Sequence, residues 1–434
     1  GTDFSQQDAA EDSGTDLASA DGDAVPCVVT SATHNFVDAD EGNIIKIFET
    51  GNGFTVGYYE IVSTAANAAT LDRACGTDGS KTGGGWSLGG ASNHPQTIAS
   101  SVVAGNIVWI EGGTYVKVGS NAYVLKTSVA GGNGTPIIWQ GYKASTSREY
   151  ATDDDRPLFN GNNDTTNGIV AGGNGNVFES IRISGATGSG FVFSAPEVGH
   201  ISARNIKSSS NGSAGFYGYN NEIECYYCEA NNNSSEGFYS GGNYRGTRGA
   251  FLYSHDNSND GIETSQQNGQ ANIFFSISDS NSGHGFNIAS DFPLLINNIA
   301  YGNTGTVDGF YFSGNGNKTA TIINNSSVSN GRYGFNRGTT TVKKIFSYNN
   351  SYYGNSTTGL NNITAGTGDV STDPSFANAA SADFTVGASS PLIGAGLDLS
   401  TFTSLTTDFN VNIGIDQSDH VTAGGGNVII VEED

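Results

Sequence analysis

The stretches Asn257-Ser-Asn-Asp-Gly-Ile262 and Asn281-Ser-Gly-His-Gly-Phe286 repeat one pattern at an interval of 24 residues. The same pairing of a glycine with a following large apolar residue recurs along the chain in steps of 22, 25, 22, 24, 24, 24, 25 and 25 residues. These pairs begin at Gly168, Gly190, Gly215, Gly237, Gly261, Gly285, Gly309, Gly334 and Gly359. A fixed period of this length without a helical pattern is typical of a solenoid of short strands.

A second register runs through the same region. An asparagine stands four residues before the glycine in most repeats, and in one repeat Asn303 lies two residues further back. The members in register are Asn211, Asn233, Asn257, Asn281, Asn330 and Asn355. Stacked identical amides can hydrogen-bond from one rung to the next. The two registers together predict an all-β chain folded as a right-handed parallel β-helix, with these asparagines as a structural ladder.

The composition changes at both ends of the repeats. Residues 1–95 contain alternating segments between Gly, Asn and Asp turns, which predict a small N-terminal β-domain. Its expected strands are 42–48, 57–62 and 69–72. The β-helix is expected over 96–369, and residues 370–434 form a C-terminal capping segment, because an open parallel edge recruits other chains. A further strand is expected at 428–431.

Charge restricts the function classes. The chain has 42 acidic and 18 basic residues, a net charge of −24, which disfavours nucleic-acid binding and tolerates neutral glycans or cations. Residues 1–23 hold seven acidic side chains and no apolar run, so this chain is expected to carry no signal peptide. Apolar runs are too short for a membrane span. No phosphate-binding loop, dinucleotide fingerprint or zinc spacing occurs, so we expect no cofactor and no metal.

The four cysteines fall into two pairs. Cys27 and Cys75 lie in the N-terminal region and can form a disulfide in an oxidising environment. Cys225-Tyr-Tyr-Cys228 has the spacing of half a metal or redox motif, but no second pair completes it. We interpret these two as small core residues in a strand, where residues three apart point to opposite faces.

Ionisable residues collect at the position just before the repeated glycine. This position holds Glu236, Asp260, His284 and Asp308, which stacking would place in one column. Neighbours would lie about 5 Å apart and alternate members about 10 Å apart, near the carboxylate separations of retaining and inverting glycosidases. Asp256 and Glu263 add further acid. The alternatives are that these are ordinary turn residues or that the carboxylates bind a cation.

Aromatic and arginine side chains suggest a glycan-binding surface. Tyr239, Tyr244, Arg245 and Arg248 lie in or beside the longest loop between two anchors, and rings with directed hydrogen bonds suit sugars. Tyrosines at 217, 239, 311 and 226–227 can form an aromatic stripe. The alternatives are a solvated loop for the arginines, and a core or intersubunit face for the tyrosines.

Two sets of segments resemble known β-helix proteins. The C-terminal set resembles the closing part of extracellular and surface right-handed β-helix proteins. It consists of the segments 373–376, 383–384, 390–393 and 394–396. The N-terminal part of the chain is similar to β-helix structural proteins of tailed phages. The similarity covers the segments 3–8, 53–61, 71–72, 89–91, 105–110, 113–115 and 134–138. The resemblance is therefore to virion surface proteins of the pectate-lyase-like superfamily. It implies virion anchoring or oligomerisation for residues 1–95.

This resemblance gives the first functional hypothesis: a virion surface protein, either a tail spike, a fibre or a capsid decoration. It implies a homotrimer that contacts other virion proteins and host-surface glycans, and it names no catalytic residues. The rival hypothesis is a glycan-cleaving enzyme, either a phage depolymerase or a secreted hydrolase or lyase. A bacterial surface adhesin at the cell surface is the third.

Overall fold

The computed structural model describes residues 12–41, 43–48, 52–89, 94–132, 134–142, 155–194, 200–219, 223–243, 246–267, 269–313, 318–338, 342–397 and 399. The predicted segments 3–8 and 428–431 lie outside the described residues. Among the described residues, no helix is long and apolar enough to cross a membrane.

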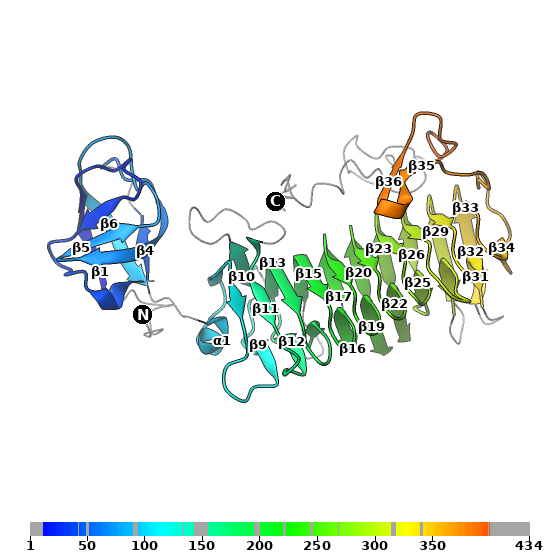
Figure 1. Cartoon of the computed structure of the whole chain (residues 1–434), viewed down its shortest axis with the longest axis horizontal. Helices are drawn as coiled ribbons and strands as arrows, with labels where there is room; N and C mark the ends of the chain where they lie inside the picture. Colours follow the sequence, from blue (N-terminus) through cyan, green and yellow to red (C-terminus); the bar gives the residue numbers. More distant parts are fainter. Residues whose placement is uncertain are drawn as a thin grey trace.

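The N-terminal part is a closed six-stranded barrel (Figure 1). Its strands, in the order β1-β2-β5-β4-β3-β6 around the barrel, are β1 (Asp12–Ser19), β2 (Val28–Thr30), β5 (Ala68–Leu71), β4 (Gly57–Ala65), β3 (Ile44–Ile47) and β6 (Lys81–Gly89). Alternate residues such as Ile45, Ile47 and Leu88 are fully buried inside it. The small β-domain expected from the alternating segments is therefore present.

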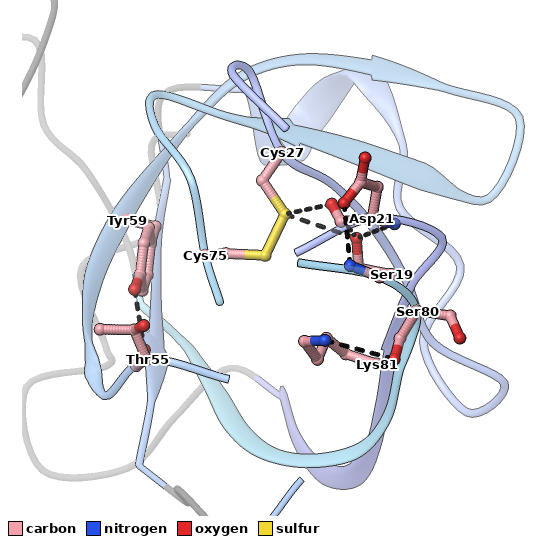
Figure 2. The surroundings of a disulfide bond; sticks show 9 residues. Ser19, Asp21, Cys27, Thr55, Tyr59, Cys75, Ser80 and Lys81 are labelled. Atoms are coloured by element: carbon pink, nitrogen blue, oxygen red, sulfur yellow. Dashed lines mark hydrogen bonds between the residues drawn. A yellow bond between two sulfur atoms is a disulfide. The ribbon is translucent and has the colours of Figure 1, made fainter. Parts of the chain in front are cut away.

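A disulfide joins two loops of this barrel. Cys27 and Cys75 are bonded at an S–S distance of 2.05 Å, and both are buried (Figure 2). Cys27 Sγ also lies 3.5 Å from the Oγ of Ser19. A cross-link over 48 residues restricts the unfolded chain and stabilises the barrel.

The repeats form a right-handed parallel β-helix (Figure 1). It follows the short helix α1 (Pro95–Ile98). One face is a ten-stranded parallel sheet, made of β9 (Tyr123–Thr127), β12 (Asn167–Ala171), β14 (Phe191–Phe193), β16 (Phe216–Tyr219), β19 (Phe238–Asn243), β22 (Ile262–Gln267), β25 (Phe286–Ile288), β28 (Phe310–Phe312), β31 (Tyr333–Arg337) and β34 (Thr358–Asn361). The residue after each repeated glycine points inward, and rings stack along the interior, as Phe310 and Phe335 do at 4.7 Å.

The other two legs of each rung form one bent sheet of 18 strands. Its strands are β7 (Ile107–Glu111), β8 (Thr114–Tyr115), β10 (Ile137–Tyr142), β11 (Leu158–Asn160), β13 (Asn176–Ser184), β15 (Ile201–Ser209), β17 (Ile223–Tyr226), β18 (Glu229–Asn231), β20 (Thr247–Ala250), β21 (Tyr253–His255), β23 (Ala271–Phe274), β24 (Ile277–Asp279), β26 (Leu294–Ile296), β27 (Ile299–Tyr301), β29 (Lys318–Ile323), β30 (Ser326–Val328), β32 (Val342–Tyr348) and β33 (Ser351–Tyr353).

The corner between these two legs corrects one expectation. Tyr227 occupies the left-handed region with a φ of 55°, so the chain turns between β17 and β18. Cys225 and Cys228 therefore both point into the core and are both free and buried, rather than lying on opposite faces of one strand. Burial raises the pKa of the Cys225 thiol, which suits an unreactive core residue.

The asparagines form a continuous hydrogen-bonded ladder. Asn233 Nδ2 donates to Asn257 Oδ1 at 3.0 Å, and Asn257 Nδ2 donates to Asn281 Oδ1 at 2.9 Å. The other links join Asn211 to Asn233, Asn281 to Asn303, Asn303 to Asn330 and Asn330 to Asn355. Asn303 thus lies in line with the others, because the turn between Asn303 and Gly309 is two residues longer than in the other repeats. A second ladder, Asn298–Asn325–Asn350, runs through the 18-stranded sheet.

Close packing explains the repeated glycine. A Cβ on Gly261 would lie 2.8 Å from the carbonyl oxygen of Gly285 and from Nδ2 of Asn281, and closer still to Oγ of Ser278. The ladder and the neighbouring serine thus fill the space that a side chain would need. Glycine is required here by contact, because its φ is not in the left-handed region.

Gly261→Ala is expected to lower the free energy of unfolding by about 1–3 kcal/mol, the cost of overpacking a well-filled interior. Gly113→Ala is the matched control, because a Cβ at Gly113 meets nothing within 4 Å. Urea denaturation measures both. Equal effects at the two glycines would contradict this account of the repeat.

A hairpin of the capping segment packs against the side of the rod. The strands β35 (Phe376–Asn378) and β36 (Asp383–Val386) form a hairpin around a short 3-10 helix, Ala379–Ser381. Phe384 is fully buried against Ile277 and Ile299, which lie on the outer face of β24 and β27. This hairpin therefore covers the side of the rod (Figure 1). The chain just before it pairs with the last rung of the 18-stranded sheet through the parallel bridges Tyr348–Thr367 and Ser351–Val370. A cover for the open end by the whole segment 370–434 stays a prediction.

Candidate functional site

Two neighbouring columns of polar side chains meet on the outer face of the ten-stranded sheet. The turn column holds Glu236, Asp260, His284 and Asp308, and successive members are joined by backbone hydrogen bonds. For example, the N–H of Gly237 donates to the carbonyl of Asp260, and the N–H of Gly261 donates to that of His284. The strand column holds Tyr239, Glu263, Asn287, Tyr311 and Asn336, which pair in register across β19, β22, β25, β28 and β31. The structure thus brings the four predicted acid-column residues together.

Glu263 and Asp260 form the acidic centre of the site. Burial, followed by the charges of Asp260 and Glu236, raises the pKa of Glu263 to about 7. Asp260 is 5% exposed, and its carboxylate accepts from the His284 N–H at 2.5 Å and from Asn287 Nδ2 at 2.8 Å. Burial outweighs these hydrogen bonds and raises the pKa of Asp260. Near neutral pH, Glu263 is therefore able to hold and release a proton.

The next rungs hold a fixed ion pair. Arg332 binds Asp308 through Nε at 2.7 Å and Nη2 at 2.5 Å, while Asn336 Nδ2 donates to the same carboxylate at 2.7 Å. The Asp308 side chain is fully buried. The N–H of Asp308 donates to Nδ1 of His284 at 2.9 Å, so a neutral His284 carries its proton on Nε2. Burial lowers the pKa of His284, which favours that neutral form.

The tyrosines of the site stack along the rod. Tyr217 and Tyr239 lie 5.3 Å apart with nearly parallel rings, and Tyr311 stacks on His284 at 4.5 Å. These rings therefore turn their faces toward neighbouring rungs. Tyr226, by contrast, ends β17 in the other sheet. The predicted stripe is thus limited to Tyr217, Tyr239 and Tyr311.

The proposed glycan-binding group is only partly present at this site. Tyr239 lies in the strand column, but Arg248 is exposed on β20 in the 18-stranded sheet, in register with Glu224 and Asn272. Tyr244 and Arg245 lie outside the described residues. The loop therefore does not place Arg248 beside the acidic column, because β19 and β20 belong to different faces of the rod.

Sequence reasoning missed three polar members of the site. Arg332, Asn287 and Asn336 each bind one of the column carboxylates. A sequence signal existed for the asparagines, since each stands two residues after a repeated glycine, the same register as Glu263. Arg332 directly precedes Tyr333, which continues the turn column, but nothing in the spacing indicates its partner.

A second ionisable cluster lies on the other sheet. Nδ1 of His255 contacts Asp256 at 2.8 Å, and its Nε2 contacts Glu229 at 3.1 Å. Lys207 also binds Glu229 at 2.7 Å. Both ring nitrogens of His255 are thus engaged by carboxylates, which favours the charged imidazolium.

This cluster predicts how stability depends on pH. Burial opposes the charge, but hydrogen bonds to Glu229 and Asp256 outweigh it and raise the pKa of His255. Its contribution to stability is therefore complete below the unfolded-state pKa of about 6.5 and is lost as pH rises through the folded value. His255→Gln should reduce the free energy of unfolding more at pH 5 than at pH 8. Urea titrations at both pH values measure this, and an equal loss at the two would contradict it.

Comparison with known proteins identifies the fold. No protein-family model and no curated protein sequence matches the chain. Pectate lyase Pel9A superposes with a TM-score of 0.53 at 16% identity, covering 75% of this chain and 93% of that one. A rhamnogalacturonan lyase gives a TM-score of 0.38 at 17% identity, with coverage of 63% and 81%. The A-module of the Azotobacter vinelandii mannuronan C-5 epimerase AlgE4 gives 0.36 at 14%, with 64% and 92%. By the superposition on Pel9A and its parallel topology, the chain is a right-handed parallel β-helix protein with the pectate-lyase-like fold.

Proposed function

We propose that this protein is a polysaccharide-cleaving enzyme whose active site is the pair of columns on the ten-stranded sheet. One observation supports this above all: the pKa of Glu263, raised to about 7 beside Asp260 and Glu236. A carboxyl group kept protonated near neutral pH next to other carboxylates is the arrangement that glycoside hydrolysis uses. Strongly perturbed acids on an open face are more common at active sites than at structural ones.

The residues divide into complementary roles in this proposal. Protonated Glu263 donates its proton to the glycosidic oxygen as the bond from that oxygen to the anomeric carbon breaks. Glu236, held by Ser235 Oγ at 2.7 Å and Asn259 Nδ2 at 2.6 Å, is the second carboxylate and either takes a proton from the attacking water or attacks the carbon itself. Asp260 keeps the proton on Glu263 before the reaction. The ion pair of Arg332 with Asp308 holds His284 in place through the Asp308 N–H.

The structural neighbour Pel9A supports this proposal over a purely structural role. One solved structure that superposes above a TM-score of 0.5, Pel9A, is a pectate lyase, and pectate is a polysaccharide. A place on a virion, a trimeric state and host-glycan contacts remain predictions from the resemblance of the N-terminal segments. A phage depolymerase would satisfy both hypotheses.

The test is direct incubation of the full chain with a panel of plant, algal and capsular polysaccharides. New reducing ends indicate hydrolysis, and the anomer formed first, read by proton NMR, tells whether Glu236 acts as a base or as a nucleophile. Ultraviolet absorbance from an unsaturated uronate would indicate a lyase and would contradict the roles given above. If no polymer in the panel is cleaved, the proposed function fails.

Asp260→Asn provides a pH test of the same site. Glu263 must be protonated to act, so activity should fall as pH rises through its pKa of about 7. The negative charge of Asp260 raises that pKa, and its removal should move the alkaline limb of the pH–rate profile to lower pH. The pH dependence of kcat measures the shift. An unmoved limb with lower kcat would show that Asp260 does not act on the Glu263 proton.

A further inference from the structure

The site carries a marked excess of negative charge. Four carboxyl groups, those of Glu236, Asp260, Glu263 and Asp308, lie in the two columns within four successive rungs. Burial is the main cause of the raised pKa of Glu263, and the charges of Asp260 and Glu236 raise it further, so both carboxylates act on the proposed reaction centre. An anionic sugar at this position would meet like charges directly.

Among the described residues, the arginine of the site, Arg332, neutralises Asp308 alone and not the other three carboxyl groups. Arg332 is held by both oxygens of the fully buried Asp308, a bidentate pair whose net charge is zero. Its guanidinium also lies 5.1 Å from the ring centre of Tyr333. Releasing it toward a ligand would leave Asp308 as an unpaired buried charge, which is strongly unfavourable.

Among the described residues, the other cations of the same sheet lie farther away. Lys126 shares the strand column with Glu263 but is five rungs from it, about 24 Å at the usual strand spacing. Arg337 lies three rungs from Thr264, the neighbour of Glu263, at about 14 Å. Both distances exceed the ~8 Å over which charges act in physiological salt.

Two other ways to accommodate an anion are also unfavourable here. His284 is held in its neutral form, because its Nδ1 accepts the Asp308 N–H and burial lowers its pKa. Among the described residues, the group of three or more potential ligands whose atoms converge within 4.8 Å is Asp21, Asp23 and Asp78 of the barrel, so the site carboxylates form no such group of three. A bridging cation would therefore find no preformed cage at Glu263.

We infer that the site selects an uncharged polysaccharide and rejects polyuronates. This inference rests on the proposed function, because that function places the polysaccharide at the two columns, but it concerns only the charge of the polysaccharide. Among the described residues of the two columns, the polar groups that remain for a ligand are neutral or acidic: the hydroxyl of Tyr239, the Nε2–H of His284 and the carboxylate of Glu236. These can exchange hydrogen bonds with sugar hydroxyls. They offer no counter-charge to a carboxylate on every sugar.

Matched polymers that differ only in charge test this inference. The full-length Glu263→Gln variant, which should bind without turnover, is run in affinity electrophoresis against methyl-esterified and de-esterified homogalacturonan, and against carboxyl-reduced and native alginate. The neutral member of at least one pair should bind at least about tenfold more tightly. Higher salt should narrow the gap, because like-charge repulsion is screened. A second substitution, Glu236→Gln, in the Glu263→Gln protein should improve binding of the acidic polymer of each pair. Glu224→Gln, a second substitution on the other sheet, should not improve it.

The outcomes separate this inference from the proposed function. Tighter binding of the acidic polymers, or binding of them that needs Ca²⁺ and is abolished by EDTA, overturns the charge selectivity even if the wild-type protein cleaves. Selective binding of a neutral polymer without cleavage by the wild type supports the selectivity and overturns the proposed function. No binding of either member of any pair overturns both.

Discussion

Replacing Glu263 with glutamine should lower kcat for polysaccharide cleavage by about 10²–10⁴-fold, the usual contribution of a general acid. Glutamine has the same shape as the protonated acid but cannot give up a proton to the leaving oxygen. Because the glycan contacts are kept, KM should change much less than kcat. The alkaline limb of the pH–rate profile should also disappear from any residual activity, since the group with a pKa of about 7 is gone. Steady-state kinetics with a reducing-end assay measures both effects.

Glu179→Gln is the matched control for this experiment. Burial also raises the pKa of Glu179, but its carboxyl lies on β13 of the 18-stranded sheet. It should leave kcat unchanged. A Glu263→Gln protein that is folded by circular dichroism and retains more than a tenth of the wild-type kcat would remove Glu263 from the role of proton donor.

The largest effect on stability is expected for Asn257→Ala, at about 3–5 kcal/mol of unfolding free energy. The Asn257 amide donates to Ala230 O, Ser254 Oγ and Asn281 Oδ1, and it accepts from the N–H and Nδ2 of Asn233. Alanine leaves buried donors and acceptors of the adjoining rungs without partners, and each such group costs about 1–3 kcal/mol. Equilibrium unfolding in urea, monitored by circular dichroism, measures the loss.

Ser258→Ala controls for substitution in the same turn. Ser258 is exposed, and its backbone N–H, which donates to Asn233 O, is kept in the variant. It should change stability by less than about 0.5 kcal/mol. A loss below about 1 kcal/mol for Asn257→Ala would mean that the ladder contributes little to the stack, whatever its geometry.

Most of the fold could be predicted because the period forces it. Residues at equal offsets in a parallel β-helix must lie over one another, so the register of glycines and asparagines indicated both the architecture and the column from Glu236 to Asp308. The corner at Tyr227 could not be predicted, because aromatic residues seldom adopt a positive φ. The sideways position of the β35–β36 hairpin also has no signal in its sequence. It depends on an apolar patch at Ile277 and Ile299 that alternation alone would equally place in a core.

The sequence by itself therefore determined the solenoid, the ladder and the presence of acid on one line, because these follow from a repeat in one dimension. Only the tertiary structure decided which of these acids can hold a proton. Glu263 acquires its raised pKa from burial and from carboxylates that are 3 and 27 residues away along the chain, and Asp308 is paired by an arginine in the next rung. A pKa depends on distances and on exclusion of water, and neither is encoded in the period.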